Sequence, residues 1–316
     1  RPIAAAAVPT TPESPPPPPR IPLDHEPTSP RPEAIAVMQP NPTFPVTPDT
    51  AGWRFLSFDV VELAPGEQHH HRLDDQETAV TPLSGRGTIG LDGTDHPVSR
   101  SSVFEELAPI GYAAPGSEVT VGAPADADGP FTFAIGSAPA EGRYPTRLVE
   151  PSTIRSEVRG GGQAHRQVNH SLAYPIEAER LILYEVYVPR GTWSGWCPHR
   201  HDGGEGSPYL EEVYYFRLDR PEGFWMHRNW HEDDPQNPFE EIYRGGDGEA
   251  ALVPAGYHSS VACPGSNMYF LNYLAGELIG EDRKTPPCFA GEHLWIESDW
   301  DQGAWNLPIV TNGDLV

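Results

Sequence analysis

Three stretches of this sequence carry side chains that together could hold a metal ion. A His-x-His pair, His199 and His201, precedes a Glu-Glu pair that ends at Glu212, and His258 follows a Pro-Ala-Gly turn. Successive side chains of a β-strand point to opposite faces, so both histidines of the pair project from one face. Three imidazole nitrogens and one carboxylate oxygen suit a divalent transition metal (Mn, Fe, Co, Ni or Zn) and leave positions open for a substrate. The pattern therefore predicts a metal centre.

The choice between the two adjacent acids depends on the face that each presents. If Val213 and Tyr215 pack into a core, alternation sends Glu212 and Tyr214 the other way, into a barrel. A slip of one residue in strand register would put Glu211 there instead. We take Glu212 as the fourth ligand on this pattern.

An earlier stretch repeats the first part of the motif. His69-His70-His71 is followed by Glu77, but the later segment Pro115-Gly116-Ser117-Glu118 offers an acid where the third histidine would be needed. We expect a degenerate copy of the site here. A second metal held by His69, His71 and Glu77 is the alternative.

The elements that must position these residues are short strands separated by turns such as Asp92-Gly93. Few stretches have the 3.6-residue period of a helix, so the pattern predicts an all-β fold. Two β-rich blocks share one plan, which favours a duplicated barrel with units at 34–145 and 146–316. The strand-like runs are Trp53–Val61, Thr88–Leu91, Ser102–Leu107, Glu118–Gly122, Phe131–Ile135, Arg180–Val188, Glu211–Leu218, Gly223–Trp230, Ala250–Pro254 and Met268–Leu274.

The first 33 residues differ in composition from the rest. Sixteen of the 38 prolines lie at or before Pro48, and a chain so rich in proline forms neither ladders nor helices. We expect residues 1–33 to be a disordered or polyproline II tail.

Composition narrows the classes of partner. The formal net charge of −24, from 45 acidic and 21 basic residues, repels phosphate backbones and argues against nucleic-acid binding. No apolar run is long enough for a membrane span, and no full signal-peptide hydrophobic region is visible. The three cysteines form no Cys-x-x-Cys pair, which fits a reducing compartment, so we expect a cytoplasmic protein. Cys197 lies close to His199, but the three histidines and Glu212 already complete a ligand set.

The order of these motifs resembles that of the cupin superfamily. The segment of about residues 50–312 resembles the 5-deoxy-glucuronate isomerase family of inositol catabolism, whose sister family is the 4-deoxy-uronate ketol-isomerases of pectin breakdown. The segments that carry the resemblance are Ser137–Ala140, Arg143–Leu148, Glu157–Gly160, Glu185–Tyr187, Pro198–Asp202, Tyr209–Tyr215 and Val253–His258.

The resemblance implies two tandem cupin (double-stranded β-helix) barrels with one divalent transition metal in the C-terminal barrel. The family's ligands map onto His199, His201, Glu212 and His258. The implied reaction is aldose–ketose isomerisation of 5-deoxy-glucuronate to 2-deoxy-5-keto-gluconate. The alternatives are a 4-deoxy-5-keto-uronate isomerase and a non-catalytic cupin that binds a sugar acid; a metal-dependent dioxygenase is a third class.

In such a reaction either a base moves a proton between the two carbons through an enediol or a hydride shifts directly, and the sequence leaves both open. The substrate carboxylate also needs a cation. By position alone, Glu211, His227 and Tyr257 are the candidates for the base. Arg228 is our candidate for the carboxylate because a guanidinium binds it through two parallel hydrogen bonds. Asn272, a polar residue on an apolar strand, is a candidate pocket residue. The expected partner is a small sugar acid, and the sequence leaves open whether the chain forms a homo-oligomer.

Overall fold

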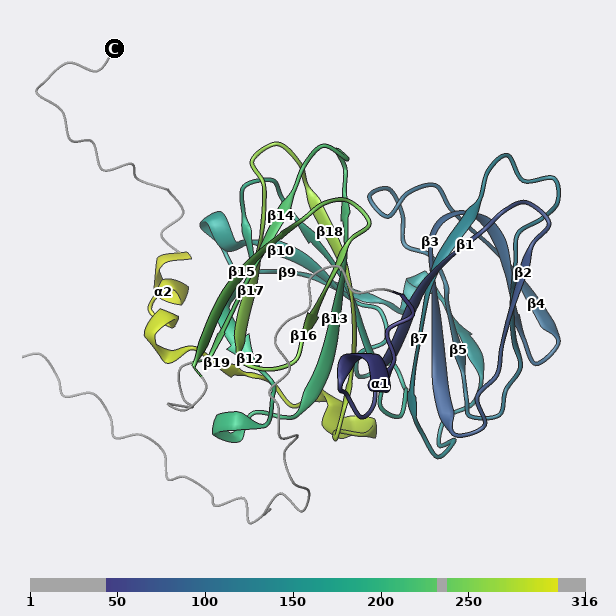
Figure 1. Cartoon of the computed structure of the whole chain (residues 1–316), viewed down its shortest axis with the longest axis horizontal. Coiled ribbons are helices and arrows are strands. Elements are labelled where there is room, and N and C mark those ends of the chain that lie inside the picture. Colours follow the sequence, from purple (N-terminus) through teal and green to yellow (C-terminus); the bar gives the residue numbers. More distant parts are fainter. Residues whose placement is uncertain (1–43, 232–237, 301–316) are drawn as a thin grey trace, which may run out of the picture. The chain divides into compact units, whose positions relative to one another are not determined.

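The computed structural model describes residues 44–231 and 238–300, and they are mostly β-strand, as the sequence predicts (Figure 1). The tail predicted for residues 1–33 lies outside the described residues. Two short α-helices, α1 (Pro48–Ala51) and α2 (Ile296–Trp300), flank the strands. The described residues also contain five short 3-10 helices, at Pro151–Thr153, Gly162–Ala164, Gly204–Gly206, Gly280–Lys284 and Gly291–His293.

The first barrel contains eight antiparallel strands. Strand β3 spans 16 residues and pairs with β7 and β5 on one part of its length and with β4 and β6 on the other. The turn between β3 and β4 is Asp92-Gly93, where both residues have positive φ (49° and 78°), as a two-residue hairpin requires. The strands are β1 (Ser57–Leu63), β2 (Gln68–His71), β3 (Gln76–Leu91), β4 (Thr94–Arg100), β5 (Ile110–Ala113), β6 (Val119–Gly122), β7 (Phe131–Pro139) and β8 (Arg147–Val149).

Two details differ from the sequence prediction. Ser102–Leu107 is not a strand, because Ser101 binds Glu105 and Glu106 through its hydroxyl (2.7 and 2.9 Å) and closes a turn. The first barrel also extends past residue 145, since β8 pairs with β5 of the same sheet.

The second barrel consists of two facing antiparallel sheets. Their orders are β16-β13-β18-β11-β10-β9 and β15-β14-β17-β12-β19. The strands are β9 (Arg155–Arg159), β10 (Arg166–His170), β11 (Ile182–Val188), β12 (Trp193–Arg200), β13 (Leu210–Leu218), β14 (Trp225–His231), β15 (Phe239–Gly245), β16 (Ala250–Val253), β17 (Tyr257–Ala262), β18 (Met268–Gly276) and β19 (Cys288–Phe289).

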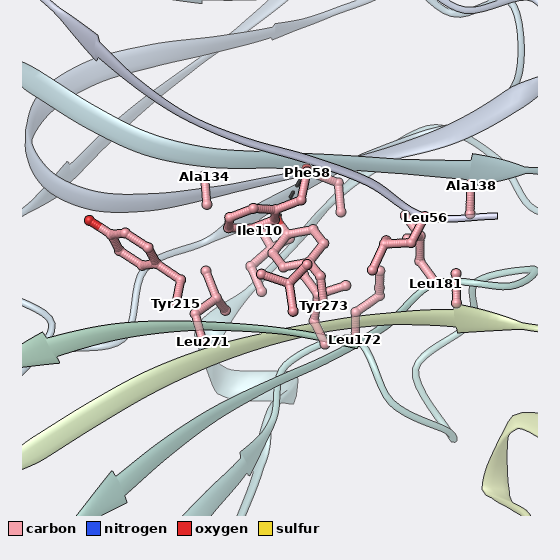
Figure 2. Packing of buried hydrophobic residues seen from close by; sticks show 14 of the residues in the cluster. Leu56, Phe58, Ile110, Ala134, Ala138, Leu172, Leu181, Tyr215, Leu271 and Tyr273 are labelled. Atoms are coloured by element: carbon pink, nitrogen blue, oxygen red, sulfur yellow. Dashed lines mark hydrogen bonds between the residues drawn. The ribbon is translucent and has the colours of Figure 1, made fainter. Parts of the chain in front are cut away.

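Strand β13 divides its side chains between two cores. Val213 and Tyr215 belong to a core shared with the first barrel, whereas Tyr214 and Phe216 pack in the interior of the second barrel. This is the register that makes Glu212, and not Glu211, point into the second barrel. The shared core is shown in Figure 2, where Phe58 and Ala134 from the first barrel face Leu271 and Tyr273 from the second. The two barrels therefore pack against each other through apolar faces.

Two buried carboxylates connect the barrels across this core. Glu77 on β3 accepts hydrogen bonds from the backbone N–H groups of residues 179–181 (2.5–2.7 Å), just before β11. Glu211 on β13 accepts from those of residues 54–56 (2.7–2.9 Å), just before β1. A tyrosine hydroxyl also donates to each carboxylate: Tyr112 to Glu77 and Tyr209 to Glu211. Each barrel thus binds the segment of chain that leads into a strand of the other barrel. We call these two sets of contacts, around Glu77 and Glu211, the joint between the barrels.

Replacing Glu77 with Gln should lower the free energy of unfolding by about 2–4 kcal/mol, because it removes the charge and leaves buried N–H groups poorly paired. Urea denaturation measures the effect. Glu62→Gln is the matched control, because Glu62 is an exposed residue of β1. Equal stability of the two variants would contradict the joint's proposed contribution.

Candidate active site

The predicted ligands from three separate segments meet in the second barrel. His199 on β12 lies directly opposite His258 on β17, and the two ring centroids are 4.4 Å apart. His201 follows β12, and its Nε2 is 2.8 Å from Oε2 of Glu212 on β13. The same oxygen is 3.2 Å from Nε2 of His258. One ligand atom from each histidine falls within 4.8 Å of those of the other two.

The turn before His258 has a specific geometry. Gly256 has φ +83°, and a Cβ there would lie 2.4 Å from the carbonyl oxygen of Trp230, so glycine is required. Its N–H donates to Asp202 (2.8 Å), which also pairs with Arg200 (2.9 Å). These contacts hold the pKa of the Asp202 carboxyl at about 2, against the opposing effect of burial. The turn is thereby fixed beside the His199–His201 segment.

Backbone carbonyls orient two of the three imidazoles. Nδ1 of His201 lies 3.0 Å from the carbonyl oxygen of Leu210, and Nδ1 of His258 lies 3.3 Å from that of Gly256. When Nδ1–H donates to these carbonyls, Nε2 of each ring is left for another partner. Histidines that bind metals are commonly oriented in this way.

Burial and mutual contact set the charges of the group. Burial and the neighbouring imidazoles hold the pKa of His199 well below its usual range, so this ring is neutral. Burial alone would raise the pKa of Glu212, but the hydrogen bond with His201 and the charges of His201 and His258 outweigh it, so that pKa is lowered. The carboxylate raises the pKa of His201 in turn, against the effect of burial.

The donor set fits a divalent metal. Nε2 of His258 is buried and makes no hydrogen bond within the described residues, although Glu212 is close. A buried, unpaired nitrogen is costly unless something binds it. Three nitrogens that lie within 4.8 Å of one another, with a carboxylate oxygen in contact with two of the rings, are donors that suit a divalent metal. The thiol of Cys197 points elsewhere and donates to the carbonyl of His293 (3.2 Å).

The described residues of the first barrel lack this arrangement, and the geometry does not support the alternative in which Glu77 is a ligand. Glu77 points into the joint between the barrels, so alternation puts Thr78 on the inner face. There Thr78 lies 3.2 Å from Nε2 of His71 and 2.9 Å from Ser137. Glu77 thus occupies the position equivalent to Glu211, and a hydroxyl replaces the carboxylate of Glu212.

Three other sequence candidates lie away from the histidine group. The carboxylate of Glu211 is held in the joint. Tyr257 alternates with His258 and packs on Trp230 and Arg200. Arg228 lies over the Trp230 ring (3.9 Å) and pairs with Glu240 (2.8 Å). Their neighbours in sequence point inward, so alternation sends these three outward or into the joint.

Two candidates do lie with the group. His227 is fully buried, stacks against His258 with a centroid distance of 5.8 Å and places Nδ1 2.9 Å from the hydroxyl of Ser260. Burial lowers its pKa to about 3. Asn272 is buried and donates to the carbonyl of Val213 (3.3 Å).

The structure adds a residue that the sequence analysis placed in the barrel without a role. Tyr214 lies edge-on to His227 (5.0 Å) and to His258 (5.9 Å). Burial and the nearby charge of Glu212 raise the pKa of its phenol well above the usual range, so it stays protonated. Tyr214 is two residues from Glu212 on the same strand, so the sequence already places both side chains on one face. This spacing could have identified Tyr214 as a residue of the site.

Comparison with known proteins decides the family. Residues 31–296 match the model of the KduI/IolB family. The chain belongs to this family. A relative named 5-deoxy-glucuronate isomerase, from Geobacillus kaustophilus (strain HTA426), is 35% identical over 256 residues, which cover 79% of this chain and 89% of the relative.

Solved structures agree with this membership. The crystal structure of an IolB-like protein from Salmonella typhimurium LT2 superposes with a TM-score of 0.74 at 30% identity, covering 82% of this chain and 98% of that chain. Bacillus subtilis oxalate decarboxylase, described with Mn(II) centres, shares the fold at 13% identity (TM-score 0.52, covering 81% of this chain and 79% of that chain). The predicted fold of two cupin barrels is thus confirmed. Within the described ranges, no helix is long and apolar enough to cross a membrane.

Proposed function

We propose that this KduI/IolB family member is a metal-dependent isomerase that converts 5-deoxy-glucuronate to 2-deoxy-5-keto-gluconate in inositol catabolism. The observation that carries the proposal is the grouping of His199, His201 and His258 inside one barrel, with the Glu212 carboxylate in contact with His201 and His258. The relatives' names supply the substrate. We also propose a cytoplasmic location, because the cysteines at 197, 263 and 288 are not joined in disulfides.

His199, His201, Glu212 and His258 would hold one divalent transition metal (Mn, Fe, Co, Ni or Zn). A bound metal supplies Lewis acidity, which polarises a carbonyl and lowers the pKa of an adjacent hydroxyl. The carboxylate charge on Glu212 stabilises such a cation, and the neutral ring of His199 offers its lone pair. A sugar that carries a carbonyl beside a hydroxyl presents the pair of oxygens that this site suits.

The isomerisation moves one proton between two adjacent carbons while the carbonyl moves the other way. Of the three proposed bases, His227 lies beside the ligand group, is neutral because burial lowers its pKa to about 3, and has a free Nε2 within the described residues. The protonated phenol of Tyr214 is placed to donate to a substrate oxygen. We assign proton transfer to His227 and hydrogen bonding to Tyr214 and Asn272.

The purified protein should contain about one metal ion per chain and turn over 5-deoxy-glucuronate. His258→Ala should lose both, because it removes a nitrogen from the set. Elemental analysis and a coupled assay on the same samples measure these outcomes. His70→Ala is the control, since His70 is an exposed residue of β2.

A substrate panel separates the proposed reaction from its relatives. Turnover of a 4-deoxy-5-keto-uronate in place of 5-deoxy-glucuronate would move the assignment to the sister reaction. Metal and sugar-acid binding without any turnover would point to a binding protein. Oxygen uptake with substrate would indicate a dioxygenase.

His227→Asn should lower kcat about 100-fold or more, because it removes the group that transfers the proton. The metal content should stay near one ion per chain, because His227 is not one of the proposed metal ligands. Single-turnover kinetics and elemental analysis measure the two quantities. Ser260→Ala is the companion variant, because Ser260 contacts Nδ1 of His227. Unchanged kcat in His227→Asn would remove His227 from the mechanism.

A further inference from the structure

Arg166 has fewer hydrogen-bond partners than the buried arginines of the described residues, Arg100, Arg200 and Arg283. Arg100 is paired with Glu185 (2.7 Å), and Arg200 with Asp202 (2.9 Å). Arg283 donates to backbone carbonyls of residues 172, 176, 181 and 280. Arg166 is half-buried and makes one hydrogen bond in the described part of the chain, a long one from Nη1 to the carbonyl of Trp196 (3.4 Å). Most of its guanidinium donors are therefore available to a ligand.

Arg166 lies on the face of the sheet that forms the interior of the second barrel. Arg166 and Val168 are two residues apart on β10, so their side chains lie on the same face of the sheet. Val168 packs in the same cluster as Tyr214 and Phe216. The contact of Arg166 with Trp196 is made across the barrel, because Trp196 lies in the irregular part of β12 just before His199. The guanidinium thus bridges the two sheets close to the ligand group.

A line of polar side chains crosses the same face of the sheet at His170, four residues along β10 from Arg166, and leads to the ligand group. Pairing places one residue from each of five strands in a row: Arg155 opposite His170, Tyr184 beside His170, then Asn272 and Tyr214. Tyr214 is two residues from Glu212 on β13. The interior face beside the ligand group therefore offers hydrogen-bonding partners for the hydroxyl groups of a sugar.

The local charge is positive, unlike that of the chain as a whole. Arg159 is the direct cross-strand neighbour of Arg166, and Glu157 is the acid beside them, already bound to Arg155, Arg159 and His170. Burial and the charge of Arg159 lower the pKa of Arg166 to about 10, so it stays charged at neutral pH. A chain of net charge −24 has here an excess of cations that suits an anion.

We propose that Arg166 binds the carboxylate of the substrate while its carbonyl end lies at the histidine–glutamate group. This assignment rests on the proposed function and replaces Arg228, whose guanidinium is paired with Glu240 on the outer face. The planar guanidinium can form two parallel hydrogen bonds with a carboxylate, which a single ammonium cannot do. Arg166 is thus a positioning and specificity residue that selects acids over neutral sugars.

Arg166→Met should reduce kcat/KM for 5-deoxy-glucuronate about 100-fold, mainly through KM, because a carboxylate contact remote from the reacting carbons binds substrate and transition state alike. Arg166→Lys should recover part of the loss, since it keeps the charge without the fork. Arg159→Met is the matched control. It removes the same charge from the neighbouring strand position, and we expect a change of about threefold or less because Arg159 is already bound to Glu157.

A neutral analogue with CH2OH in place of the carboxylate, 5-deoxy-glucose, gives the decisive comparison. Wild type should prefer the acid, and Arg166→Met should lose that preference while handling the neutral analogue as wild type does. Thermal unfolding and metal content establish that the variant is folded and loaded. An unchanged preference in Arg166→Met, or an equal loss in Arg159→Met, would overturn the assignment.

Calorimetric titration of the metal-loaded protein with both sugars separates this inference from the proposed reaction. If wild type binds the acid more tightly than the neutral analogue, without turnover, and Arg166→Met abolishes the difference, the carboxylate site stands and the reaction fails. If wild type turns over the acid and Arg166→Met matches it in both assays, the reaction stands and the role of Arg166 is refuted.

Discussion

The buried joint between the barrels determines which way the side chains of β13 face. Glu211 accepts three backbone N–H groups from the segment that leads into β1, so its side chain must point toward the first barrel. Because a strand alternates, Glu212 must then point into the second barrel, toward His201 and His258. A one-residue slip would both unpair the joint and remove the carboxylate from the histidines. The packing of the two barrels and the geometry of the site are therefore one constraint.

The same constraint explains why the duplicated barrels differ chemically. Glu77 makes the equivalent joint from the first barrel, and the next residue, Thr78, takes the inward position that Glu212 has in the second. Burying a carboxylate costs free energy unless hydrogen bonds replace its water, and three N–H groups and a tyrosine hydroxyl do so at each joint. The joint carboxylate is present in both barrels, whereas the inward carboxylate is present in one.

Much of this could be predicted from the sequence because the signals were local. His-x-His, the Glu-Glu pair and the Pro-x-Gly-x-His turn each lie on one strand or turn, and alternation gave the face of Glu212 correctly. Glu77 was misassigned as a candidate ligand because its partners are backbone N–H groups about a hundred residues away, which no local pattern reveals. The strand predicted at Ser102–Leu107 failed because side-chain contacts from Ser101 favour a turn.

The choice of an arginine for the substrate carboxylate is a second case in which local sequence patterns do not reveal contacts between distant segments. Arg228 is adjacent to His227, so sequence position favoured it, yet alternation that sends His227 inward sends Arg228 outward to Glu240. Arg166 is far from every ligand in sequence and reaches the site only because β10 joins the six-stranded sheet and its side chain spans to Trp196 beside His199. The proposed metal site could be recognised in the sequence from its candidate ligands. The groups that choose its substrate come from whichever strands complete the barrel, and tertiary structure is needed to find them.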